Sequence, residues 1–281
     1  MPVETVSAAN GLRKLKVSDS SGSTAEVYLQ GAQLTSWIPA RGSEMIFLSK
    51  ASLYRPGAAI RGGTPVVFPQ FADLGPLPKH GIVRTVDWES QEPSSASRAA
   101  LALKANDESR KVWPHEFRAS IVVEPAGQTL TVRLSIENTG KAPFSFAAAL
   151  HTYFRVADCE QARITGLSGT KYRDRGNWSS TWVEDRPVLT ISGELDRVYI
   201  DSPRAIVVSD EAMPRKFQVS QEGFSDTVVW NPGAELAAKL TDMQPHEYRE
   251  MLCIEAAQVM QPAMVQPGKR WEGSQRVEVI D

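Results

Sequence analysis

Two titratable side chains stand out because each accompanies an apolar segment with the period of a β-strand. In residues 144–154, alternation places His151 on one face with Tyr153 and the small residues that precede it. In residues 251–257, the same rule places Glu255 on one face of an otherwise apolar strand. Burial would raise the pKa of this carboxyl toward the range of a general base, and His151 would be a titratable group at the edge of a floor of small residues left open for a ligand. The pattern alone leaves open that His151 is a hydrogen-bonded core histidine and that Glu255 forms a structural pair or faces water.

A second candidate region combines arginines with turn-forming residues. Residues 60–71 contain Arg61, two glycines directly after it and two prolines, which excludes a regular central strand and predicts a stiff loop. An extended strand beginning at His80 would place His80, Ile82 and Arg84 on one face. Arg61 and Arg84 could then bind a phosphate through charge-assisted, fork-shaped hydrogen bonds. The alternative for both arginines is a surface salt bridge.

The sequence offers no motif for a metal or a nucleotide cofactor. Cys159 and Cys253 lie far apart and belong to no Cys-x-x-Cys pair or Cys/His cluster. Cys253 is two residues from Glu255, and because no histidine is near it in sequence, we interpret it as a small core thiol. Gly-x-Gly-x-x-Gly and P-loop motifs are absent from the sequence. We therefore expect no metal and no cofactor.

Composition excludes two classes of partner. The 281 residues include 31 basic and 33 acidic side chains, for a net charge of −2, with no dense Lys/Arg tract for nucleic acid or an anionic membrane. The longest run without Asp, Glu, Lys or Arg, residues 27–40, has 14 residues. A membrane helix needs roughly 20 apolar residues. Residues 1–12 lack the pattern of a signal peptide, so we expect a cytoplasmic protein.

Short strands must position these side chains. Residues 129–137 alternate most clearly, and 234–242 alone has the composition of a short helix, which Pro245 would stop. Because βαβ alternation and long linkers are missing, the sequence predicts one all-β domain over residues 1–281, a large antiparallel β-sandwich. The other strand-like segments are residues 25–38, 45–48, 83–88, 99–104, 117–123, 144–154, 188–191, 205–208, 216–219, 227–230, 251–257 and 276–280.

Six blocks of the sequence resemble, in order, the glucose-6-phosphate 1-epimerases, the hexose-6-phosphate mutarotase branch of the aldose 1-epimerase superfamily. Several blocks in the family's order are far more specific than any one of them. The resemblance implies a sandwich of the galactose mutarotase type and cofactor-independent interconversion of the α and β anomers of a hexose 6-phosphate, glucose 6-phosphate being expected. The blocks are residues 61–69, 77–84, 146–154, 194–199, 226–232 and 253–255.

The resemblance also implies roles for the two titratable residues. In the family, the glutamate that matches Glu255 takes the proton from the anomeric hydroxyl, and the histidine that matches His151 protonates the ring oxygen. The ring opens, rotation about the C1–C2 bond exposes the other face of the carbonyl, and closure reverses both transfers. One carboxylate and one imidazole satisfy the needs of general acid–base catalysis.

Four further residues match substrate-binding positions of the family. His80 matches a histidine that hydrogen-bonds the sugar near the reacting centre, and Asp196 matches an aspartate that binds sugar hydroxyls. Arg61 and Arg84 match positions associated with anion recognition. The expected partner is therefore a small-molecule sugar phosphate, and we expect the protein to be a monomer.

Departures from the family pattern concern substrate choice more than the acid–base pair. Ala72 stands where glycine is common, Ile82 replaces an aromatic residue, and Gly233 stands where a bulky aromatic residue is frequent. Two alternatives are therefore retained: an aldose 1-epimerase acting on free sugars, and a non-catalytic carbohydrate-binding sandwich. A glycosidase would need a second well-placed carboxylate, and the sequence offers none as persuasive as Glu255.

Overall fold

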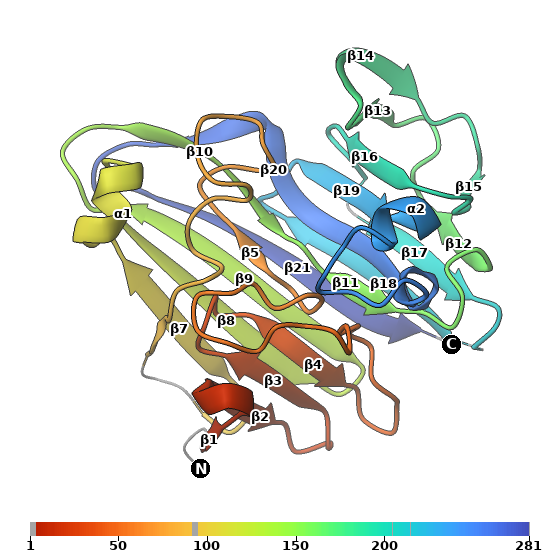
Figure 1. The fold of residues 1–281 in the computed structure, drawn as a ribbon, viewed down its shortest axis with the longest axis horizontal. Helices are drawn as coiled ribbons and strands as arrows, with labels where there is room; N and C mark the ends of the chain where they lie inside the picture. Colours follow the sequence, from red (N-terminus) through yellow and green to blue (C-terminus); the bar gives the residue numbers. More distant parts are fainter. Residues whose placement is uncertain (1–3, 92–94, 204, 214, 281) are drawn as a thin grey trace.

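The computed structural model describes residues 4–91, 95–203, 205–213 and 215–280, whose strands form two large antiparallel sheets facing each other and a smaller N-terminal sheet (Figure 1). The predicted antiparallel β-sandwich is confirmed. Sheet I consists, in order, of β14 (Asn177–Val183), β13 (Lys171–Asp174), β16 (Leu195–Tyr199), β19 (Asp226–Asn231), β20 (Met251–Val265), β10 (Phe144–Leu150) and β5 (Val66–Val67), and β11 (Tyr153–Arg155) pairs with β20.

The second large sheet, sheet II, packs against one face of sheet I, and the main core lies between them. Sheet II consists, in order, of β15 (Val188–Leu189), β12 (Ala162–Thr165), β17 (Ala205–Asp210), β18 (Arg215–Glu222), β21 (Arg270–Ile280), β9 (Thr129–Asn138), β8 (Phe117–Ala126), β7 (Ala99–Lys104) and β6 (Glu89–Ser90). Sheet III consists of β1 (Glu4–Ser7), β2 (Arg13–Ser18), β3 (Thr24–Tyr28) and β4 (Leu34–Ile38).

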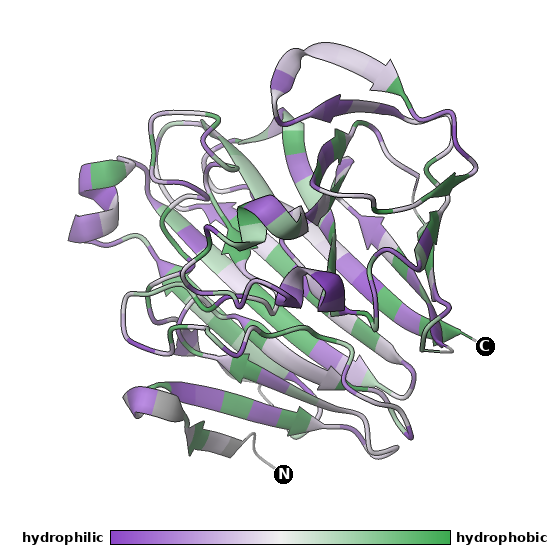
Figure 2. Cartoon of the chain, turned by 45° about the vertical axis from the view of Figure 1, so that its right-hand side comes forward, coloured by the Kyte–Doolittle hydropathy of each residue, from purple (hydrophilic) through white to green (hydrophobic). Residues whose placement is uncertain are grey.

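Alternation along the strands decides which side chains enter the core. Figure 2 shows hydrophobic and hydrophilic residues alternating along the long strands. In β9, the predicted strand at 129–137 is confirmed, because its apolar residues Leu130, Val132, Leu134 and Ile136 are all buried.

Strand β10 presents two different faces. Phe144, Phe146 and Leu150 enter the main core between sheets I and II. Ala149, and Tyr153 on the following strand β11, belong instead to a second apolar cluster on the other side of sheet I. Strand β20 divides its side chains in the same way, so both strands turn one face toward each cluster. The parity expected for this segment is therefore confirmed.

Helices contribute little, but they differ from the prediction. α2 (Gly233–Ala237) is shorter than the predicted 234–242, and α1 (Asp107–Val112) was not predicted. α1 buries none of its residues, so no apolar periodicity marks it in the sequence. A capping box formed by Asn106 and Ser109 begins the helix. Two short 3-10 turns, Ala9–Gly11 and Glu247–Glu250, complete the helical elements of the described ranges. Among these residues no helix has the length and apolar character needed to cross a membrane.

Some strands also differ from the prediction. Residues 45–48 and 83–88 form only isolated bridges instead of strands. Strands β12, β13, β14 and β16 were missed because their sequences are short or largely polar, and β14 buries none of its residues. Alternation marks a strand only where one of its faces is apolar and buried.

His80 lies in a turn, so the extended strand considered from His80 to Arg84 does not form and that prediction is wrong. His80 and Gly81 both have positive φ, 64° and 78°. The amide of Ile82 donates to the carbonyl of Phe68 at 3.0 Å, and the Ile82 side chain packs against the main core. His80 and Arg84 nevertheless line one pocket, without sharing a strand face with Ile82.

Replacing Gly81 tests this turn. A Cβ at Gly81 would lie 2.0 Å from the Phe68 carbonyl oxygen. We expect Gly81→Ala to lower the free energy of unfolding by more than the roughly 1–2 kcal/mol that a left-handed alanine costs. Gly268→Ala is the matched control, because Gly268 has φ +69° and nothing within 4 Å of the added Cβ. Urea denaturation of both variants measures the difference, and equal losses would contradict the close approach.

Candidate active site

The strand pairing places His151 and Glu255 opposite each other. Leu150 pairs with Ala256 and Tyr153 pairs with Cys253, so His151 falls across from Glu255 in the same register. Side chains at opposite positions of an antiparallel pair lie on one face. The His151 Nδ1 atom is 3.2 Å from the Glu255 Oε1 atom, and the residues are 9% and 1% exposed.

Burial controls the charge of this pair. Loss of solvation raises the pKa of the Glu255 carboxyl well above its usual range, and the charge of Asp196 adds to the shift. Loss of solvation lowers the pKa of His151, and the positive charges of Arg61 and Arg84 act in the same direction. When the free protein holds one proton on this pair, the proton is therefore favoured on Glu255, which leaves a neutral carboxyl beside a neutral imidazole.

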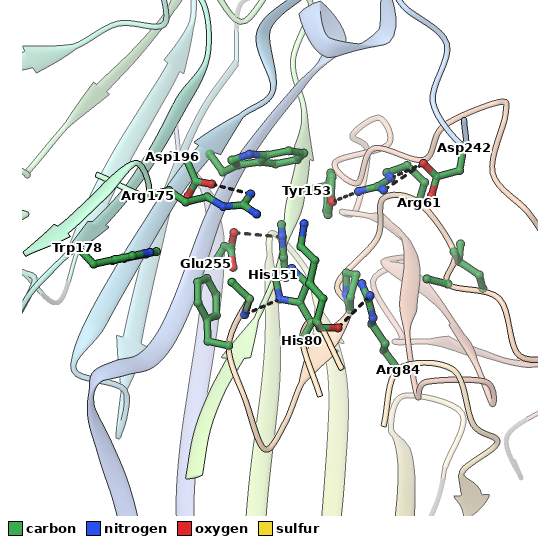
Figure 3. Close-up of a pocket in the computed structure, with 17 residues that line it drawn as sticks. Arg61, His80, Arg84, His151, Tyr153, Arg175, Trp178, Asp196, Asp242 and Glu255 are labelled. Carbon is green, nitrogen blue, oxygen red and sulfur yellow. Dashed lines mark hydrogen bonds and ion pairs between the residues drawn. The ribbon is translucent and has the colours of Figure 1, made fainter. Parts of the chain in front are cut away.

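Two atoms of the pair lack hydrogen bonds. His151 Nδ1 and Glu255 Oε2 are buried and have no hydrogen-bond partner among the described residues. Most buried polar atoms in proteins are hydrogen-bonded, and exceptions concentrate at functional sites. The pair lines a pocket between Arg61 and Asp242 on one side and Arg175 and Asp196 on the other (Figure 3).

His80 lies beside the pair and is uncharged at neutral pH. Its ring centroid is 5.5 Å from that of His151, in an edge-to-face arrangement. The Ala72 amide donates to His80 Nδ1 at 3.4 Å, which leaves the ring proton on Nε2. Burial and the neighbouring charges, Arg84 foremost, lower the pKa of His80 to about 3. His80 can therefore act as a neutral hydrogen-bond donor.

One side of the pocket carries excess positive charge. The Arg61 Nε and Nη2 atoms contact Asp242 Oδ1 at 3.1 and 3.0 Å, and its Nη1 atom donates to the Tyr153 hydroxyl at 3.1 Å. Arg84 donates to the Lys79 carbonyl oxygen at 3.1 Å. Neither Arg84 nor the Lys79 ammonium forms an ion pair within the described ranges. Burial and the nearby arginines lower the pKa of Lys79, a shift that a bound anion would oppose.

The opposite side of the pocket carries a carboxyl and indole rings. Asp196, on β16, contacts Arg175 through Oδ2 and Nη1 at 3.3 Å. Burial raises the pKa of Asp196 to about 6, although Arg175 opposes this shift. Trp178 and Trp230 also line the pocket and provide flat apolar surfaces of the kind on which sugar rings stack.

The structure brings together all six residues singled out in the sequence: Arg61, His80, Arg84, His151, Asp196 and Glu255. Sequence reasoning missed Lys79, Arg175, Trp178 and Asp242 as pocket residues. Arg175 directly follows the unpredicted strand β13, and Trp178 is the second residue of the unpredicted strand β14, so no local pattern marked either residue. Two signals could have identified the others: Lys79 directly precedes His80, and Asp242 is the last residue of the helix predicted over 234–242.

A cluster of possible metal ligands occurs at the same place. The ligand atoms of His151, Cys253 and Glu255 lie within 4.8 Å of one another. Burial raises the pKa of the Cys253 thiol and of the Glu255 carboxyl, which keeps both protonated, whereas a metal needs them deprotonated. The surrounding arginines and lysine also repel a cation. These residues therefore do not suit a metal ion.

Family comparison agrees with this site and fold. The chain belongs to the aldose 1-epimerase family, because the profile of that family matches residues 13–278. It is therefore an enzyme of the isomerase class, a mutarotase whose substrate is a small sugar.

Individual relatives cover nearly the whole chain. A protein of Cenchrus ciliaris is 36% identical over 281 residues, which cover 96% of this chain and 85% of the relative. A protein of Escherichia coli (strain K12) is 32% identical over 287 residues, covering 99% and 96%. Both carry the name "Putative glucose-6-phosphate 1-epimerase". A crystal structure from Salmonella typhimurium, described as "a putative mutarotase", matches with a TM-score of 0.89 and 27% identity over 100% of this chain and 94% of the other.

The depressed pKa of His80 predicts a pH dependence of stability. The unfolded pKa is near 6.5 and the folded value is about 3, so the unfolded state binds more protons between these values. Stability from this group is full above pH 6.5 and is lost as pH falls toward 3, at up to about 1.4 kcal/mol per pH unit. We expect His80→Asn, which retains an acceptor near Nδ1, to flatten this slope in urea denaturation series. An unchanged slope would show that His80 is not held neutral.

Proposed function

We propose that this enzyme interconverts the α and β anomers of a hexose 6-phosphate, with glucose 6-phosphate as the substrate. One observation carries the proposal: the buried His151–Glu255 pair shares its pocket with two cations, Lys79 and Arg84, that have no carboxylate partner among the described residues. The pair fits acid–base chemistry, and the cations fit a phosphate dianion. The names of the two curated relatives support the same substrate.

The chemistry needs two proton transfers in opposite directions. The Glu255 carboxylate accepts the proton of the anomeric hydroxyl while the His151 imidazolium gives a proton to the ring oxygen, which breaks the C1–O5 bond. The open aldehyde rotates about C1–C2, and the two transfers then run in reverse. Each step leaves one proton on the pair, so the enzyme returns to its starting state.

Substrate charge prepares the pair for this exchange. The free site favours a neutral carboxyl and a neutral imidazole, partly because Arg61 and Arg84 disfavour a positive charge on His151. A phosphate dianion held by these arginines would offset their field and raise the pKa of His151. The proton of the pair would then be favoured on His151 rather than on Glu255, giving the carboxylate and imidazolium that ring opening requires.

The two sides of the pocket suit the two ends of the substrate. Arg61 and Arg84 lie on the side where the phosphate would bind, across from Asp196 (Figure 3). Asp196 can accept hydrogen bonds from sugar hydroxyls, and His80 can donate through Nε2 near the reacting centre. A pyranose would then span the His151–Glu255 pair, with the ring against the tryptophans.

Substitution of the pair tests the chemistry. We expect Glu255→Gln and His151→Asn each to lower kcat about 10²- to 10⁴-fold, the usual contribution of a positioned acid or base. Exchange NMR on an equilibrated mixture of glucose 6-phosphate anomers measures the rate. Thermal unfolding checks that each variant is folded, and Glu184→Gln, which removes a buried carboxylate outside the pocket, is the matched control. Folded variants with unchanged kcat would refute the assignment.

Substitution of the unpaired arginine tests the phosphate. Arg84→Met should lower kcat/KM for glucose 6-phosphate roughly 10- to 150-fold, corresponding to one charge-assisted hydrogen bond of about 1.5–3 kcal/mol. The rate on glucose should change little, because glucose lacks the phosphate. Arg163→Met, on β12 and outside the pocket, is the control. If Arg84→Met and Arg61→Ala both keep the preference for the phosphorylated sugar, the substrate assignment is wrong.

A further inference from the structure

The strand that carries His151 is interrupted next to that residue. The Thr152 amide donates to the Leu150 carbonyl at 2.9 Å, a tight turn between residues two apart. A regular antiparallel pair would exchange two bonds between Thr152 and Ile254. Only one is present, from the Ile254 amide to the Thr152 carbonyl at 3.2 Å. The turn therefore deprives the buried Ile254 carbonyl of its partner in the ladder.

A side chain from the other sheet replaces the missing bond. Gln275, on β21 of sheet II, is 1% exposed and donates from Nε2 to the Ile254 carbonyl at 2.9 Å. Its Oε1 atom accepts from the Thr152 hydroxyl at 2.6 Å. The Thr152 hydroxyl in turn accepts from the Thr64 hydroxyl at 3.2 Å. One carboxamide thus binds both the interrupted segment, at Thr152, and the neighbouring strand β20, at Ile254.

We propose that Gln275 is a positioning residue for the acid–base pair. Thr152 directly follows His151, and Ile254 directly precedes Glu255, so the carboxamide holds the two proton-transferring side chains in register without touching substrate. The inference rests on the proposed function of the pair. Loss of these bonds would let the interrupted strand shift, and displacements near 1 Å can cost on the order of 100-fold in rate.

The chain contains a matched control for a purely structural role. Gln221, on β18, lies directly opposite Gln275 in the β18–β21 ladder and is also buried. Its carboxamide likewise crosses to sheet I, where it donates to the Asp226 carbonyl at 3.0 Å and accepts from the Thr227 hydroxyl at 3.3 Å. It bonds neither of the segments that carry the pair.

The experiment compares Gln275→Leu, Thr152→Val and Thr152→Ser with Gln221→Leu. We expect Gln275→Leu and Thr152→Val to lower kcat for glucose 6-phosphate about 10- to 100-fold, with KM changed by less than about threefold. Thr152→Ser keeps the hydroxyl and should restore most of the rate. Gln221→Leu should lose thermal stability without this loss of kcat. The ring resonances of His151, followed by NMR against pH in the free protein, should move in Gln275→Leu and stay in place in Gln221→Leu.

The outcomes distinguish failure of the positioning role of Gln275 from failure of the proposed mutarotase function. Unchanged kcat and unchanged His151 resonances in Gln275→Leu would overturn the positioning role, as would an equal loss of kcat in Gln221→Leu. If Gln275→Leu does not fold, the contrast between Thr152→Val and Thr152→Ser decides, because each changes a single group. A wild-type protein that does not accelerate anomer exchange would refute the proposed function, whereas the His151 resonances would still report on Gln275.

Discussion

The burial of an imidazole against a carboxyl group is the constraint on which the rest of the site depends. His151 and Glu255 are both buried, so burial disfavours the charged form of each side chain. Such a pair persists only where the surrounding structure determines its geometry. Pairing of β20 with β10 and β11 does so, because it puts the two residues at opposite positions on one face.

The charges around the pair are left unbalanced toward the positive sign. Asp242 neutralises Arg61 and Asp196 neutralises Arg175, but Arg84 and Lys79 keep their charge without an ion pair in the described part of the chain. Lys79 is exposed, so its missing ion pair is unremarkable, whereas Arg84 is half-buried and still lacks one. The imbalance lowers the pKa of His80 and His151 in the free protein, and the proposed phosphate would offset it.

Sequence patterns predicted those parts of the site that depend on local geometry. The faces of His151 and Glu255 follow from a period of two, which every strand obeys. The turn at His80 did not follow, because the positive φ angles of His80 and Gly81 break the alternation that an extended strand would impose. Arg175 lies in a polar segment and reaches the pocket only through long-range pairing of sheet I. The role of Asp196 came from the family resemblance alone, whereas residue types and spacing already suggested Arg61 and Arg84 as phosphate ligands.

The segment that carries His151 is also bonded to the loop that carries Arg61. The His151 amide donates to the Pro65 carbonyl and the Tyr153 amide to the Gly63 carbonyl, at 3.0 and 2.9 Å, so this stretch is bonded directly to the loop that follows Arg61. The Tyr153 ring stacks on His151 at 4.8 Å, and its hydroxyl accepts from Arg61. The proposed phosphate, if bound at Arg61, would therefore influence the imidazole through its charge and through the Tyr153 ring that contacts it. This connection requires a strand bonded on both edges, to β20 and to the arginine loop, which a solvent-exposed edge strand could not provide.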